Sequence, residues 1–206
     1  MIGENRRAHW DHVYLSKGEA GVSWFEPTPT ASLDLIRRHA GSVAAPLADI
    51  GGGASHLVDS LLEDGFDAVT VLDLSAAALE ASRRRLGADA GKVEWIVADV
   101  TTWEPMRSYD IWHDRAAFHF LTEPKAREAY IERLRMALSP GGHAIIATFA
   151  PDGPERCSGL PVVRYDPATL AETIGAPFRL VDERRCLHTT PWGSRQAFQY
   201  SVLERS

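Results

Sequence analysis

The chain has 206 residues, and its 22 Lys and Arg residues against 28 Asp and Glu residues give a formal net charge of -6. This length suits one domain with a sizeable hydrophobic core. A composition of 45% hydrophobic and 24% charged residues is typical of globular proteins and disfavours disordered, collagen-like and coiled-coil classes. The acidic balance makes nucleic acid an unlikely partner, because nucleic-acid-binding proteins usually carry a basic surface.

The sequence has no feature of a membrane or disulfide-rich protein. No apolar run reaches the roughly 18 residues that a membrane span needs, and the polar first residues lack the apolar segment of a secretory signal. The two cysteines, Cys157 and Cys186, make neither a disulfide framework nor a four-ligand zinc set. We therefore expect a cytoplasmic protein with no membrane partner and no metal.

Short apolar runs alternate with amphipathic stretches along the chain, which is the pattern of βαβ units. Helices are expected at 4–16, 30–40, 56–64, 76–86, 124–138 and 168–174. Strands are expected at 46–50, 69–72, 93–97, 110–113, 143–149, 179–187 and 197–203. Residues 18–29 and 151–165 are expected to be loops, because they are rich in Gly, Pro and polar residues.

Five strand–helix pairs followed by a closing strand pair predict an α/β fold with a doubly wound, mostly parallel, seven-stranded Rossmann-like sheet. The last two strands have a short connection, so they should form a C-terminal antiparallel hairpin at one sheet edge. We expect a single domain over residues 1–206. Its parts are an N-terminal helical cap (1–44), a ligand-binding core (45–150), a substrate lid insertion (151–166), and a closing helix and hairpin (167–206).

Acidic residues follow the first three strands of the predicted sheet, where such folds bind their ligands. Asp49 ends the first strand and precedes Gly51 and Gly53, whose lack of a side chain lets a ligand lie against the backbone. Asp73 ends the second strand, where a carboxylate can accept hydrogen bonds from ribose hydroxyls. A dinucleotide fingerprint needs a third glycine where His56 stands, so a pyrophosphate cradle is disfavoured.

This order of acids and glycines resembles class I S-adenosylmethionine-dependent methyltransferases over about residues 45–203. The resemblance implies S-adenosyl-L-methionine as cofactor and S-adenosyl-L-homocysteine as product. Dehydrogenases and aminopropyltransferases on the same fold remain alternatives. The family's cofactor contacts carry over by position, with Ser55 a mild departure from the usual third small residue: Asp49, Gly51, Gly53 and Ser55 at the methionine part, Asp73 and Leu74 at the ribose, and Asp99 and Val100 at the adenine.

Residues 109–120 begin in the fourth strand and should end over the methyl group. The Asn-Pro-Pro-aromatic motif of family members that methylate exocyclic base or amide nitrogens is absent, and His113-Asp114-Arg115 stands in its place. The run from Asp114 to Phe118 is similar to an element of thiopurine-methyltransferase-like enzymes, which act on thiols and other soft nucleophiles. A similar run occurs in protein-lysine methyltransferases.

The resemblance makes three residues of this segment catalytic candidates. His113 would orient the cofactor or act as a base near neutral pH, and it is also counted among the cofactor-binding residues. Asp114 and Arg115, which follow His113 directly, are the other two catalytic candidates. The architectural alternatives are a hydrogen-bonded histidine at a strand end and two adjacent opposite charges that pair with each other or with neighbours.

Further candidates surround the expected acceptor position. Aromatic residues ahead of the first strand would fold over the site, with Tyr14 and Trp24 toward the cofactor and Phe25 toward the acceptor. His119 would reach the acceptor, and Arg164 in the insertion would hold an acidic acceptor. The alternatives are a hydrophobic plug for the aromatic residues, burial for His119 and an ordinary loop role for Arg164.

We therefore expect an S-adenosylmethionine-dependent methyltransferase that moves a methyl group by in-line displacement to a small-molecule acceptor. Thiols and other soft nucleophiles are candidate acceptors. Two alternatives stay open. A protein-lysine methyltransferase would have an open acceptor groove, and a cofactor-binding module would hold the cofactor without turnover. An RNA methyltransferase fits the charge balance less well.

Overall fold

A computed structural model describes the backbone of residues 2–206 and the side chains from residue 5 onward. The helices are α1 (Ile2–Lys17), α2 (Thr30–His39), α3 (Leu57–Glu63), α4 (Ala76–Leu86), α5 (Pro124–Ala137) and α6 (Pro167–Ile174), with short 3-10 turns η1 (Gly87–Lys92) and η2 (Phe118–Phe120). The strands are β1 (Leu47–Ile50), β2 (Val69–Asp73), β3 (Glu94–Val97), β4 (Tyr109–Arg115), β5 (Leu138–Phe149), β6 (Arg156–Cys157), β7 (Leu160–Pro161), β8 (Phe178–Thr189) and β9 (Arg195–Arg205).

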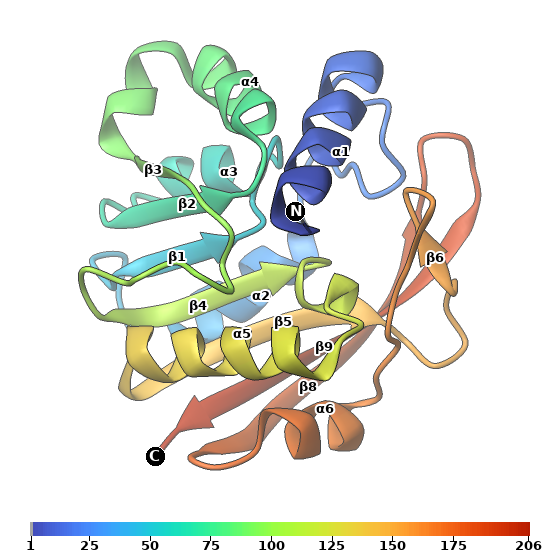
Figure 1. Cartoon of the computed structure of the whole chain (residues 1–206). Helices are drawn as coiled ribbons and strands as arrows, with labels where there is room; N and C mark the ends of the chain where they lie inside the picture. Colours follow the sequence, from blue (N-terminus) through green and yellow to red (C-terminus); the bar gives the residue numbers. More distant parts are fainter. Residues whose placement is uncertain (1) are drawn as a thin grey trace.

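Seven strands form one sheet in the order β3-β2-β1-β4-β5-β9-β8 (Figure 1). The pairs among β1 to β5 are parallel, whereas β9 runs antiparallel to both β5 and β8. The predicted α/β class, the doubly wound sheet and the closing hairpin are therefore confirmed. The strand order reverses between β1 and β4, which is the topological switch point where such sheets bind ligands.

Helices cover both faces of the sheet. Successive residues of a strand point to opposite sides, so each strand contributes side chains to both faces. On one side, Leu47 and Ile111 join an apolar cluster with residues of α2 and α3. On the other side, Ala48 and Trp112 join a cluster with residues of α5 and α6. Trp112 is fully buried, and its indole N–H donates to the Tyr130 hydroxyl at 2.8 Å.

Two segments differ from the sequence-based expectation. No helix follows β3 in the described chain, so the expectation of five strand–helix pairs is wrong there. The segment turns instead: the Asp99 carboxylate accepts from the Thr101 amide at 2.9 Å, and Pro105 further along lacks the N–H that a helix needs. The insertion after β5 contains the small antiparallel pair β6 and β7, where an irregular loop was expected.

Helix α1 lies beside α4, at the end of the sheet where the strand arrows of β1, β2 and β4 point (Figure 1). The β6–β7 pair and the β8–β9 hairpin lie on the other side of α1 in this view. None of the described helices is both long and apolar enough to cross a membrane. The helical cap and the insertion thus stand near the carboxyl ends of the parallel strands, where the candidate site is found.

Candidate functional site

One cavity, of about 1230 Å³ including its solvent-open mouth, lies at the carboxyl ends of β1, β2 and β4. Most of the predicted site residues line it: Tyr14, Trp24, Phe25, Asp49, Gly51, Ser55, Asp73, Leu74, Asp99, Val100, His113 and Arg115. Helix α1 and the loop after it form one wall, and the strand ends form the other.

The turn after β1 leaves no room for side chains. Gly53 has φ +48°, and a Cβ at this position would lie 2.9 Å from both Asp73 Oδ2 and the Tyr14 hydroxyl. A Cβ on Gly52 would collide with Asp49 Oδ2. The two carboxylates therefore approach the backbone of this turn closely, as the resemblance requires of a cofactor loop. Gly53 shapes the turn but is not itself part of the cavity lining.

Helix α1 is anchored on the amino end of α4. Ser75 Oγ accepts from the Ala78 amide at 3.1 Å and donates to Asp11 Oδ1 at 2.6 Å. Asp11 Oδ1 also accepts from the Ala77 amide at 3.2 Å. A carboxylate is stabilised at a helix amino end, so the α1 side chain acts as a second cap for α4 and holds α1 over the pocket.

Asp73 is only 8% exposed, and its Oδ1 accepts from the Ser75 amide at 2.7 Å. Burial, helped by the negative charges of Asp49 and Asp11 and opposed by the Ser75 amide, raises the pKa of Asp73 to about 7. Burial and the charge of Asp73 also raise the pKa of Tyr14, so its phenol stays neutral. The native fold thus holds a carboxyl with a raised pKa at the end of β2, and perturbed pKa values of this kind cluster at functional sites.

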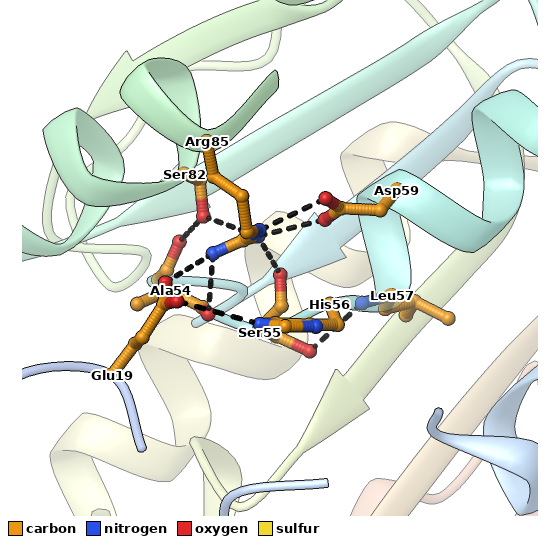
Figure 2. A network of polar contacts seen from close by, with 9 residues as sticks. Glu19, Ala54, Ser55, His56, Leu57, Asp59, Ser82 and Arg85 are labelled. Carbon is orange, nitrogen blue, oxygen red and sulfur yellow. Dashed lines mark hydrogen bonds and ion pairs between the residues drawn. The ribbon is translucent and has the colours of Figure 1, made fainter. Parts of the chain in front are cut away.

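Arg85 of α4 fixes the glycine turn against the helical cap (Figure 2). Its guanidinium makes two hydrogen bonds to Asp59, at 2.9 and 2.7 Å, and one to Glu19 at 2.5 Å. It also donates to the carbonyl oxygens of Ala54 at 3.3 Å and Ser55 at 2.8 Å. One side chain therefore joins the turn, α3 and the loop that follows α1.

The wall opposite the strand ends is aromatic. Trp10 contacts Trp24 and Phe120 with ring centroids 5.7 and 5.0 Å apart, and Tyr14 lies 6.3 Å from Trp24. Edge-on contacts of this kind are favourable between aromatic rings. The rings give the cavity an apolar side that excludes water and can face a cation.

His113 lies between Asp49 and Ser32 and is 2% exposed. Its Nδ1 is 2.7 Å from Asp49 Oδ1, and its Nε2 is 2.9 Å from Ser32 Oγ. The registered pairing of Asp49 with His113 across β1 and β4 sets this contact. Because both ring nitrogens are engaged, His113 can orient Asp49, but it has no free nitrogen to act as a base in this structure.

Arg115 lines the cavity from the end of β4. It donates to the Trp24 carbonyl at 2.9 Å and to Glu26 Oε1 at 3.0 Å, and it stacks 4.6 Å from the Phe198 ring centroid. Glu26 also contacts His188 Nδ1 at 3.1 Å. Burial opposes ionisation of Glu26, but the His188 hydrogen bond and the Arg115 charge outweigh it and lower the pKa of this carboxyl.

Besides Gly53, three predicted residues do not line the cavity: Asp114, His119 and Arg164. Asp114 is fully buried, and its carboxylate accepts from the Tyr130 hydroxyl at 2.7 Å and the Ala117 amide at 2.9 Å, so its role here is to hold the turn after β4. Its expected catalytic contact is corrected on this ground. It does not pair with Arg115 either.

His119 and Arg164 need the same correction. His119 is fully buried between the rings of Phe120 and Phe149, with centroids 4.5 and 4.9 Å away. Burial lowers its pKa to about 3, so the ring is neutral. Arg164 donates to the Gly153 carbonyl at 3.1 Å and to a carboxylate at 3.1 Å within its own insertion. Neither side chain reaches the cavity in this structure.

Sequence reasoning missed several residues that build the site: Asp11, Glu19, Glu26, Ser32, Gly52, Arg85 and Tyr200. Gly52 had a visible signal, since it stands between two glycines that were chosen. The others had none, because their contacts join elements far apart in the chain, such as Ser32 in α2 with His113 in β4. From the insertion, Cys157 alone is among the cavity-lining residues that the structure describes.

Comparisons with known proteins agree with this geometry. A family model described as a methyltransferase domain matches residues 47–142. The trans-aconitate 2-methyltransferase of Rhizobium leguminosarum bv. trifolii (strain WSM2304) is 34% identical over 158 residues, which cover 76% of this chain and 49% of that protein. The chain thus spans about half the length of this curated relative.

Two solved structures share the fold at low sequence identity. A SAM-dependent methyltransferase from Anabaena variabilis has a TM-score of 0.76 at 15% identity, covering 100% of this chain and 96% of that one. The 1,6-didemethyltoxoflavin-N1-methyltransferase of Burkholderia thailandensis, with 1,6-didemethyltoxoflavin and S-adenosylhomocysteine bound, has a TM-score of 0.70 at 21% identity, covering 100% and 87%. Residues 47–142 of this chain are thus similar to a methyltransferase domain, and the whole chain shares the fold of these solved methyltransferases.

Proposed function

We propose that this chain binds S-adenosylmethionine in the cavity and transfers its methyl group to a small-molecule acceptor. The observation that carries the proposal is the placement of Asp49, Asp73 and Asp99 at three neighbouring strand ends, all on one wall of a single cavity with an aromatic opposite wall.

The cavity fits the cofactor through features of its own. The turn at Gly52 and Gly53 lets two carboxylates reach the space beside the backbone. Burying the Asp73 carboxylate costs free energy. Ribose hydroxyls that reach this carboxylate would donate hydrogen bonds to it and so offset part of that cost. Asp99 and Val100 would flank the adenine, and Tyr14 and Trp24 would cover the cofactor from α1 and its following loop.

The acceptor would occupy the side of the cavity formed by Trp10, Trp24, Phe120, Arg115 and Cys157. The bound cofactor supplies a methyl group on a positively charged sulfur, which leaves as a neutral thioether. The protein holds the nucleophile in line and excludes water, and orientation of this kind is worth roughly 7–11 kcal/mol. The cavity lies under α1, which favours a small molecule over the open groove of a protein-lysine methyltransferase.

Both ring nitrogens of His113, the histidine that lines the described cavity, are engaged, which favours an acceptor that needs no strong base. A thiol, with an ordinary pKa of about 8.5, ionises without a strong base, and the charge of Arg115 nearby favours its thiolate. This supports a thiol or another soft nucleophile. Phe25 remains a proposed acceptor contact at the cavity wall.

A carboxylate acceptor is the second candidate, and one observation favours it. Arg6 of α1 lines the cavity, and no ion pair to it is found among the described side chains. The relative from Rhizobium is named for trans-aconitate, a small tricarboxylate, which needs no base because its oxygens are already ionised. Arg6 would then hold a second carboxylate group of the acceptor.

A labelled methyl-transfer screen tests the proposal and separates the candidates. Purified protein is first titrated calorimetrically with S-adenosylhomocysteine, and then incubated with labelled S-adenosylmethionine and thiols, polycarboxylates, phenols, N-heterocycles, cell protein or RNA. We expect binding and transfer to thiols or polycarboxylates. Binding without transfer to any acceptor indicates the cofactor-binding module, transfer to protein indicates the lysine methyltransferase, and no binding refutes the proposal. Arg6→Ala should reduce transfer to polycarboxylates alone.

A further inference from the structure

Five polar side chains from four elements form a continuous chain of hydrogen bonds behind the cavity. Arg115 Nε donates to the Tyr200 hydroxyl at 3.2 Å, and that hydroxyl is 3.4 Å from Ser32 Oγ. Ser32 Oγ is 2.9 Å from His113 Nε2, and His113 Nδ1 is 2.7 Å from Asp49 Oδ1. The chain therefore runs from the acceptor side of the cavity to the acid of the glycine turn.

The sheet register explains why these residues meet. Arg115 pairs with Ala147, and Ala147 pairs with Tyr200, so all three side chains point to the same face of the sheet. Ala147 is small and fully buried, which leaves room for the longer side chains on either side of it to touch. Ser32 reaches the chain from α2, which covers this face.

One assignment of donors and acceptors satisfies every hydrogen bond in the chain. A guanidinium only donates, so Arg115 gives its hydrogen to the Tyr200 oxygen. Burial raises the pKa of Tyr200, which keeps its own hydrogen, and Ser32 Oγ is the acceptor within reach. Ser32 then gives its hydrogen to His113 Nε2, and His113 gives its Nδ1 hydrogen to the Asp49 carboxylate.

Other assignments strand a buried hydrogen. If His113 carried a hydrogen on Nε2, Ser32 would have to accept it, and either the Ser32 or the Tyr200 hydrogen would lose its acceptor among the described residues. A buried polar group without a partner is costly enough to select one arrangement of the hydrogens. The neutral ring with hydrogen on Nδ1 is therefore the form that the fold selects.

We propose that Ser32 and Tyr200 are positioning residues for the cofactor. They lock His113 in the form that donates to Asp49, and this hydrogen bond fixes the orientation of the Asp49 carboxylate at the glycine turn. The proposal deepens the proposed function, on which it rests for the identity of the ligand. It also assigns His113 an orienting role and withdraws it from proton transfer to or from the acceptor.

The closing experiment measures two things on the whole chain. The first is the dissociation constant of S-adenosylhomocysteine by calorimetry for wild type, Ser32→Ala, Ser32→Thr and Tyr200→Phe. The second is the ring nitrogen NMR signature of His113, identified by comparison with His113→Asn, which reports which nitrogen carries hydrogen. Thermal unfolding of each variant separates a positioning effect from a loss of folding.

The matched control is Ser201→Ala. Ser201 is the chain neighbour of Tyr200, is fully buried, and has a hydroxyl with no hydrogen-bond partner among the described residues. Removing that hydroxyl changes the same strand but not the chain of hydrogen bonds. We expect no change in affinity for S-adenosylhomocysteine in this control.

For the chain of hydrogen bonds, we expect the His113 ring of wild type to carry hydrogen on Nδ1 and none on Nε2 at pH 7. Ser32→Ala and Tyr200→Phe should bind S-adenosylhomocysteine about tenfold more weakly, and Ser32→Thr should restore most of the affinity. Wild-type hydrogen on Nε2, or unchanged affinity in both variants, overturns the proposal. If wild type fails to bind the ligand, the proposed function fails, while the His113 signature still decides the direction of the chain.

Discussion

Asp73→Asn should stabilise the unliganded protein at the expense of cofactor binding. The native carboxyl has a pKa of about 7, against 3.8 ordinarily. Between these values the native state keeps a proton that the unfolded chain has released, so the free energy of unfolding falls as the pH rises through this window and levels off above it. A difference of about 3 in pKa corresponds to a cost on the order of 4 kcal/mol.

Asparagine removes the charge but keeps an oxygen for the Ser75 amide, which now bonds to Asp73 Oδ1 at 2.7 Å. At pH 8 we expect the variant to be more stable than wild type by roughly 2–4 kcal/mol. At pH 5 the gain should shrink to less than half, because the native carboxyl then keeps its proton and the unfolded chain has gained only about one pH unit of ionisation above 3.8. Urea unfolding at both pH values measures the difference, and Asp99→Asn at a half-buried strand end is the matched control.

The same variant should bind S-adenosylhomocysteine at least tenfold more weakly, since hydrogen bonds to a charged acceptor contribute roughly 1.5–3 kcal/mol. Calorimetry measures this loss. A variant that is less stable than wild type at pH 8, or a gain that does not depend on pH, would refute the reasoning about the buried charge. Unchanged affinity would remove Asp73 from the ribose role.

Three other substitutions test the site. Arg85→Ala should lower the free energy of unfolding by about 2–4 kcal/mol, because it leaves Asp59 and the turn carbonyls unpaired; stability within 0.5 kcal/mol of wild type, roughly the scatter of surface substitutions, contradicts this. His119→Phe should reduce the loss of stability that wild type shows as the pH falls below 6.5, because the native ring, with a pKa of about 3, stays neutral while the unfolded ring gains a proton. The same change in unfolding midpoint between pH 7.5 and pH 5 in wild type and variant would count against it. Arg164→Ala should leave the acceptor KM unchanged, and a several-fold rise would return Arg164 to the acceptor site.

The strand-end acids show how much of the site local pattern can carry. Asp49, Asp73 and Asp99 could be placed together because parallel strands end at the same edge of a sheet, and this edge follows from the order of apolar runs. Gly51 and Gly53 were recognisable because a sharp turn next to a ligand demands residues without side chains.

The acceptor side could not be predicted in the same way. His119 and Arg164 have suitable chemistry and lie in suitable segments, but a side chain's direction depends on what packs around it. Phe120 and Phe149 enclose His119, and the carbonyl of Gly153 draws Arg164 away from the cavity. No pattern along the chain reports these neighbours.

The sequence by itself determined the sheet, its closing hairpin and the row of acids at its edge, because these depend on periodicity and on short-range turn chemistry. The tertiary structure alone decided the burial of Asp73 and the hydrogen-bond partners of His113. Ser32 and Tyr200 stand far apart along the chain, yet they meet Arg115 and His113 on one face of the sheet. Hydrogen bonds act over about 3 Å in space, whatever the separation in sequence.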